Sequence, residues 1–154
     1  MPNSTSPIVV LMADDDADDR EMTRDAFEAS RLANDLRFTV DGVDLMDYLN
    51  HRGKYSDPAS SPRPGLILLD LNMPKKDGRE ALAEIKADPR LTDIPVIVLT
   101  TSKEEEDINR SYTLHASSYI TKPVTFQALV NIVNDLGKYW LEIVELPHRR
   151  KSIA

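Results

Sequence analysis

The sequence predicts an α/β fold in which five helices cover a doubly wound, five-stranded parallel sheet. Short runs of aliphatic residues, typical of strands buried on both faces, alternate along the chain with segments of helical spacing. Right-handed crossovers between parallel strands place the intervening helices on both faces of such a sheet. With 154 residues, the chain is long enough for one such domain and too short for two.

In the first half of the chain we expect two strands, two helices and a long loop. The strands are Ile8 to Met12 and Leu36 to Val40, and the helices run from Ala17 to about Leu32 and from Val43 to about Gly53. Asp16 is placed to cap the first helix, and Asp18 and Asp19 stand in its first turn, where the helix dipole favours carboxylates. The segment from Lys54 to Pro64 contains three prolines and three serines and is expected to be an irregular surface loop.

The second half of the chain continues the alternation with three strands and three helices. The strands are Leu66 to Asp70, Val96 to Leu99 and Ser118 to Thr121. The helices run from the Asp77-Gly78 turn to the residue before Pro89, from Lys103 to Leu114, and along a last amphipathic stretch from Phe126 to Trp140.

Composition excludes several classes of protein. Hydrophobic residues make up 41% and charged residues 29% of the chain, which is typical of a soluble globular protein. The longest aliphatic runs are too short to cross a bilayer, and the N-terminus resembles no secretion signal. The absence of cysteine excludes disulfides and thiolate metal sites, and it suits the cytoplasm. A net charge of -7 argues against nucleic-acid binding by the whole domain.

Polar residues stand where the predicted strands end. In doubly wound sheets, ligands bind outside the carboxyl ends of the strands. Asp70 directly follows four large aliphatic residues, and a carboxylate at the edge of a core needs a partner or solvent. The other strand ends supply Asp14 with Asp15, Thr100 and Lys122. We therefore expect three carboxylates, one hydroxyl and one ammonium to meet at one edge of the sheet.

These groups suit the transfer of a phosphoryl group. Three crowded carboxylates repel one another unless a cation binds them, and ligand sets made only of oxygen favour Mg²⁺. Asp70 would be the nucleophile, Lys122 would hold a phosphoryl oxygen, and Thr100 would donate to the attached phosphate. Each residue alone has a plainer explanation as a helix cap, a strand end or a strand-edge lysine. Their coincidence at successive strand ends favours the phosphoryl site.

Four segments resemble the receiver domain of bacterial two-component response regulators over roughly Pro7 to Trp140. They are LMADDDADDRE, LLDLNMPKKDG, VIVLTTS and SSYITKPV. The resemblance implies a flavodoxin-like sheet with strand order 2-1-3-4-5. It also implies that Asp15, Asp70 and the carbonyl of Asn72 ligate Mg²⁺, that Asp14 acts mainly through water, and that the Lys122-Pro123 peptide is cis. Thr100 and Tyr119 would switch the surface beyond the site when Asp70 is phosphorylated.

Further segments resemble the stand-alone response regulators that pair with bacterial phytochrome kinases. They are the loop from Lys54 to Pro64, LHASSYITKP and YWLEIVELP. We expect an N-terminal tail at residues 1–7, a receiver domain at 8–142 and an extension at 143–154 without an output domain. The signal would then pass through protein contacts, including a homodimer formed by the last helix and the extension. The sequence departs from the usual pattern in three ways. Asp14 replaces glutamate, Thr101 replaces a smaller residue, and the loop from Lys54 to Pro64 is longer than in minimal receivers.

Three functional hypotheses follow. The leading one is a receiver that takes a phosphoryl group from a sensor histidine kinase and catalyses only its own phosphorylation and dephosphorylation, so that it is a signalling domain and not an enzyme. The second hypothesis is a phosphatase with an aspartate nucleophile. Such enzymes usually need a second acid two residues after the nucleophile, and Asn72 at this position argues against the hypothesis. A pseudo-receiver or adaptor that works without phosphate is the third, and the intact set of Asp15, Asp70, Thr100 and Lys122 argues against it.

Overall fold

Five parallel strands form one sheet in the order β2-β1-β3-β4-β5, as the resemblance implied. The computed structural model describes residues 9–29, 35–100, 118–122, 125 and 127–128, with only the backbone of Ala29, Thr100 and Ser118. The strands are β1 (Val9–Ala13), β2 (Asp35–Thr39), β3 (Leu66–Asp70), β4 (Val96–Thr100) and β5 (Ser118–Thr121). Every neighbouring pair is parallel, so all carboxyl ends lie at the same edge.

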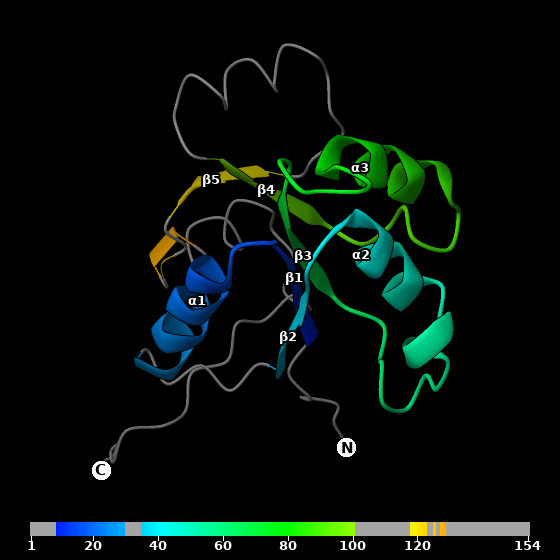
Figure 1. Ribbon diagram of the computed structural model, residues 1–154, viewed down its shortest axis with the longest axis horizontal. Coiled ribbons are helices and arrows are strands. Elements are labelled where there is room, and N and C mark those ends of the chain that lie inside the picture. The colour runs from blue at the N-terminus through cyan, green and yellow to red at the C-terminus, as the bar shows by residue number, and fades with distance from the viewer. Residues whose placement is uncertain (1–8, 30–34, 101–117, 123–124, 126, 129–154) are drawn as a thin grey trace.

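Helices cover both faces of this sheet. Within the described ranges they are α1 (Ala17–Ala29), α2 (Gly42–Leu49) and α3 (Gly78–Ala87), with a 3₁₀ turn, η1 (Gly53–Tyr55). Figure 1 shows α1 on one side of the sheet and α2 with α3 on the other. The helices predicted from Lys103 to Leu114 and from Phe126 to Trp140 lie outside the described residues, apart from Gln127 and Ala128. Among the described helices, none has the length and apolar character of a membrane span.

Several boundaries differ from the prediction by one residue, and the end of the second helix differs by more. β2 begins at Asp35, one residue earlier than expected, in register with Val9 of β1. The second helix ends at Leu49 and not near Gly53, because His51 adopts a left-handed backbone conformation with φ 55°. Few non-glycine residues take this conformation, so the sequence gives no signal for it.

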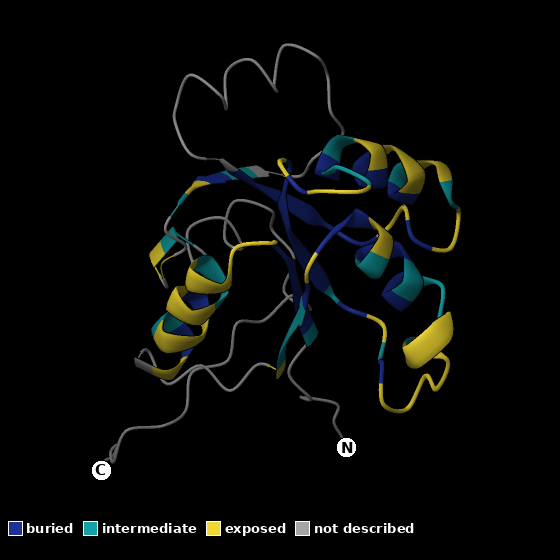
Figure 2. Ribbon diagram, viewed as in Figure 1, coloured by how far each residue is buried: buried dark blue, intermediate teal, exposed yellow. Residues whose placement is uncertain are grey.

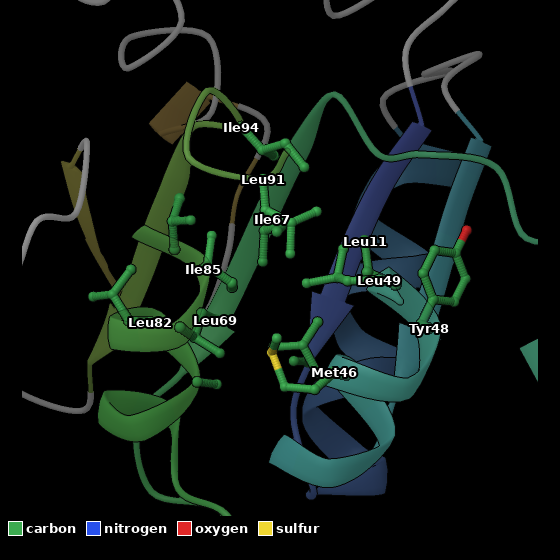
Figure 3. Close-up of a cluster of buried hydrophobic side chains, with 14 of the residues drawn as sticks. Leu11, Met46, Tyr48, Leu49, Ile67, Leu69, Leu82, Ile85, Leu91 and Ile94 are labelled. Carbon is green, nitrogen blue, oxygen red and sulfur yellow. The ribbon is translucent and has the colours of Figure 1, made fainter. Parts of the chain in front are cut away.

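Two hydrophobic clusters fill the space between the sheet and its helices. Side chains alternate between the faces of a strand, so neighbouring residues of β1 and β3 enter different clusters. Figure 3 shows Leu11, Ile67 and Leu69 packed against α2 and α3, whereas Met12 and Leu68 belong to the cluster of Phe27 in α1. β3 is buried along its whole length (Figure 2). This alternation directs Asp70 and Asp14 toward the face that α1 covers.

Two glycines hold the loop after β3 close to the sheet. A Cβ atom at Gly42 would collide with the carbonyl of Lys76, and one at Gly78 would collide with the carbonyl of Asp70. The Gly78 amide donates to the carbonyl of Leu71 over 2.8 Å. Asp77 and Glu80 complete a capping box at the start of α3. The segment that carries Asn72 is therefore held beside the end of β3.

Candidate functional site

Three aspartates form an acidic cluster at the carboxyl edge of the sheet. Carboxylate oxygens of Asp14, Asp15 and Asp70 lie within 4.8 Å of one another. Asp14 follows β1 and Asp70 ends β3, and these two strands are neighbours in the sheet. Asp14 is fully buried, Asp70 is 5% exposed, and Asp15 faces solvent. The structure thus brings together the three carboxylates that the strand ends predicted.

Backbone amides fix the two buried carboxylates. Oδ1 of Asp14 accepts a hydrogen bond from the amide of Asp16 over 2.9 Å, and Oδ1 of Asp70 accepts one from the amide of Asn72 over 3.1 Å. In both residues the other oxygen, Oδ2, faces the side chain of Lys122. The two carboxylates therefore have the same arrangement, with one oxygen held by the loop and one directed at the ammonium.

Lys122 reaches this cluster from the end of β5. Its Nζ lies 2.7 Å from Oδ2 of Asp19, 2.9 Å from Oδ2 of Asp14 and 3.3 Å from Oδ2 of Asp70. The ammonium donates hydrogen bonds to Asp19 and Asp70. Oδ2 of Asp14 is buried and accepts no directed hydrogen bond from any described residue, so it meets Lys122 only as an ion pair.

Burial and charge act in opposite directions on these groups. Burial raises the pKa of Asp14 to about 6, although the Asp16 amide and Lys122 counteract part of the rise. Burial also raises the pKa of Asp70 above its usual range, against the Asn72 amide and Lys122. For Lys122, burial alone would lower the pKa, but the contacts with Asp19 and Asp14 outweigh it and the pKa is raised. Lys122 is therefore an ammonium at every physiological pH.

The acidic cluster fits a hard divalent cation. One ammonium carries too little charge to neutralise Asp19 as well as the three carboxylates of the cluster. Burial also disfavours the ionised forms of Asp14 and Asp70, which raises the pKa of both. The donors are all oxygen, the ligand type that Mg²⁺ and Mn²⁺ favour. Oδ2 of Asp14 is a buried acceptor whose one partner among the described residues is the Lys122 ammonium at 2.9 Å, and it has a further lone pair for a cation or its water.

The other predicted site residues lie around this cluster. Asn72 is exposed and stands two residues after Asp70, in the loop that Gly78 closes. Thr100 ends β4, between β3 and β5, and its side chain lies outside the described structure, as does Pro123. Tyr119 is half-buried and packs against the cluster on the face of α2 and α3.

Two residues of α1 belong to the site although the sequence did not single them out. Asp19 makes the shortest contact with Lys122, and Nη1 of Arg20 donates to the carbonyl of Asp14 over 2.7 Å. The sequence prediction placed Asp19 only in the first turn of a helix. Asp19 meets Lys122 across 103 residues of sequence, and no spacing pattern in the sequence indicates this contact.

Comparisons with known proteins give consistent matches. A family model described as the response regulator receiver domain matches residues 10–134. The response regulator Rcp1 of Synechocystis sp. is 44% identical over 144 residues, which cover 94% of this chain and 96% of Rcp1. The structure of the bacteriophytochrome response regulator AtBRR matches with 38% identity and a TM-score of 0.81, covering 94% of this chain and all of AtBRR (100%). The structure of the Mn²⁺-bound form of Rcp1 matches with 45% identity and a TM-score of 0.68, and the match covers 92% of this chain and 99% of that structure's chain.

Proposed function

The chain belongs to the response regulator receiver domain family, and from this premise we propose that Asp70 accepts a phosphoryl group from the phosphohistidine of a sensor histidine kinase. The observation that carries the proposal is the position of Asp70. Its carboxylate ends a strand that is buried along its whole length, lies within reach of Asp14 and Asp15, and has Lys122 Nζ at 3.3 Å. A nucleophile, a counter-charge and a set of cation ligands thus stand together.

The transfer step needs an ionised Asp70. A carboxylate oxygen attacks the phosphorus, the bond between phosphorus and the kinase histidine breaks, and its electron pair remains on the imidazole nitrogen. The product is an acyl phosphate on Asp70. Lys122 favours the ionised nucleophile against the effect of burial and then donates to a phosphoryl oxygen, because its ammonium already lies beside Oδ2.

Asp14, Asp15 and Asp70 would hold Mg²⁺ together with the carbonyl of Asn72, Asp14 acting mainly through water. A bound cation supplies charge neutralisation for the carboxylates and for the phosphoryl oxygens during transfer. The acidic cluster supports this assignment, and so does the buried Oδ2 of Asp14, which meets only the Lys122 ammonium among the described residues. The Mn²⁺-bound structure of the relative Rcp1 supports it independently.

The output would be a change of protein contacts in a phytochrome-type light-sensing pathway in the cytoplasm. Thr100 would respond to the phosphate and Tyr119 would follow, which alters the surface near β4 and β5. A homodimer through the last helix and residues 143–154, beyond a receiver domain at 8–142, would carry the signal. The similarity to the bacteriophytochrome response regulator AtBRR over 94% of this chain supports the pathway.

Acetyl phosphate tests the proposal without knowledge of the kinase. The protein is incubated with acetyl phosphate and Mg²⁺, and its intact mass is measured. We expect the mass of one phosphoryl group on the wild type and on an Asp93→Asn control, which changes an exposed aspartate. Asp70→Asn should take up none. No uptake by the wild type, or equal uptake by Asp70→Asn, would contradict the proposal.

A further inference from the structure

We propose that Asp19 is a positioning residue that keeps the Lys122 ammonium beside Asp70 when a divalent cation occupies the acidic cluster. The proposal deepens the proposed function and rests on it for its role in phosphoryl transfer. The link that carries it is the contact of 2.7 Å between Asp19 Oδ2 and Lys122 Nζ, the shortest of the three that the ammonium makes with carboxylates.

Asp19 differs from the other two partners of Lys122 because it lies outside the acidic cluster. Asp14 and Asp70 belong to the group of carboxylates that can share one cation, and Asp19 does not. A cation bound by that group attracts the oxygens that now face Lys122 and repels the ammonium. The contacts with Asp14 and Asp70 then weaken, whereas the hydrogen bond to Asp19 remains. Without Asp19, Lys122 and the cation would compete directly for the same oxygens.

The surroundings make this contact stronger than an ordinary surface ion pair. The side chain of Lys122 is 14% exposed and that of Asp19 is 27% exposed, so water screens the pair only in part. Asp19 also lies in the first turn of α1, where the helix dipole stabilises a carboxylate. A charge-assisted hydrogen bond in such a place restricts where the ammonium can go.

The first turn of α1 is also fixed relative to the site. Oδ1 of Asp16 accepts from the Asp18 amide over 2.8 Å and caps the helix, as the sequence predicted. Arg20 ties the same turn to the carbonyl of Asp14, and Phe27 anchors the helix in the core. Asp19 therefore presents its carboxylate from a rigid element on the face where Asp14 and Asp70 lie. The geometry suits a residue that positions Lys122.

Two measurements on the same set of variants test the proposal. The variants are Asp19→Asn, Asp19→Glu, Lys122→Gln and the double variant Asp19→Asn with Lys122→Gln. Asp18→Asn is the matched control, alone and combined with Lys122→Gln. It removes the same charge one residue away, from an exposed side chain without a hydrogen bond or ion pair in the described structure. Thermal unfolding followed by circular dichroism checks that all variants are folded.

The first measurement is the rate of phosphoryl uptake from acetyl phosphate at saturating Mg²⁺. We expect Asp19→Asn to be about tenfold slower than Asp18→Asn, the size of effect that a hydrogen bond between charged groups can produce. Asp19→Glu should recover part of the rate. In the Lys122→Gln background, Asp19→Asn and Asp18→Asn should react equally, because the residue that Asp19 positions is gone. An equal effect of Asp19→Asn with and without Lys122 would overturn the proposal.

The second measurement is Mg²⁺ affinity by titration calorimetry, which does not depend on phosphorylation. We expect Asp19→Asn to weaken Mg²⁺ binding more than Asp18→Asn does, because Lys122 then competes with the cation for the same oxygens. In the Lys122→Gln background, the two variants should bind Mg²⁺ with equal affinity. Equal affinities of the two single variants would overturn the proposal. If the wild type took up no phosphoryl group, the proposed function would fail, and the calorimetric comparison would still decide whether Asp19 positions Lys122 when the cation is bound.

Discussion

Replacing Asp14 by asparagine should stabilise the metal-free protein at neutral pH. Asparagine keeps the oxygen that accepts the Asp16 amide and removes the charge from a fully buried side chain. Its Nδ2 takes the place of Oδ2 beside the Lys122 ammonium, so the free energy obtained from the pKa is an upper bound on the gain. The carboxyl has a pKa of about 6 in the folded protein, against an ordinary value of 3.8. A difference of about two pKa units corresponds to at most about 3 kcal/mol of folding free energy, since each unit is worth about 1.4 kcal/mol.

The sign of this effect sets its pH dependence. Between the two pKa values the folded protein binds more protons at Asp14 than the unfolded chain does, so the contribution of Asp14 to stability falls as pH rises. The penalty is absent below the unfolded pKa of 3.8 and complete above about 6. The difference in unfolding free energy between Asp14→Asn and wild type should therefore be near zero at pH 3.8 and below. It should reach its maximum above about pH 6.

Urea unfolding in the presence of a chelator, at several pH values, measures this difference. Asp93→Asn serves as a control for an exposed aspartate and should change little. Saturating Mg²⁺ should shrink the advantage of Asp14→Asn, because the cation stabilises the wild-type carboxylate. A variant that is less stable than wild type at neutral pH without metal, or an advantage that grows toward acid pH, would refute the reasoning.

Three further substitutions test the fold around the site, each by urea unfolding. Gly42→Ala should cost about 1 to 3 kcal/mol, because its Cβ would meet the carbonyl of Lys76, and a cost below about 0.5 kcal/mol would show that the loop yields freely. Leu68→Ala should cost about 2 to 5 kcal/mol, because the side chain is fully buried in β3, and a neutral result would contradict the described core. Tyr55→Phe should cost about 1 kcal/mol, because the hydroxyl donates to Oδ1 of Asp44 over 2.8 Å, and unchanged stability would mean that this bond adds nothing.

The part of the site that comes from strand ends could be predicted from the sequence. Asp70 follows an uninterrupted aliphatic run, and the carboxyl ends of parallel strands share one edge, so the meeting of Asp14, Asp70 and Lys122 follows from the fold class. The same alternation of aliphatic runs and helical segments gave the sheet and the three helices in the described structure.

The contribution of α1 and the end of α2 could not be predicted in the same way. Whether the first turn of α1 directs Asp19 at Lys122 depends on how Phe27 seats the helix against the sheet, and this rotation comes from tertiary packing. Helix α2 ends because His51 adopts a left-handed backbone conformation, for which glycine would have been the usual signal. The position of Asp19 thus depends on contacts between segments distant in sequence, and the end of α2 depends on an uncommon backbone conformation.

The central claim is that Asp70 carries the phosphoryl group, and chemical trapping tests it most directly. An acyl phosphate is reduced by borohydride, which converts the modified aspartate into homoserine, and peptide mass spectrometry locates the change. After reaction with acetyl phosphate and Mg²⁺, we expect the reduced residue at position 70 in the wild type. Reduction at Asp14, Asp15 or another aspartate instead of Asp70, or a phosphorylated protein with no reducible residue, would contradict the account.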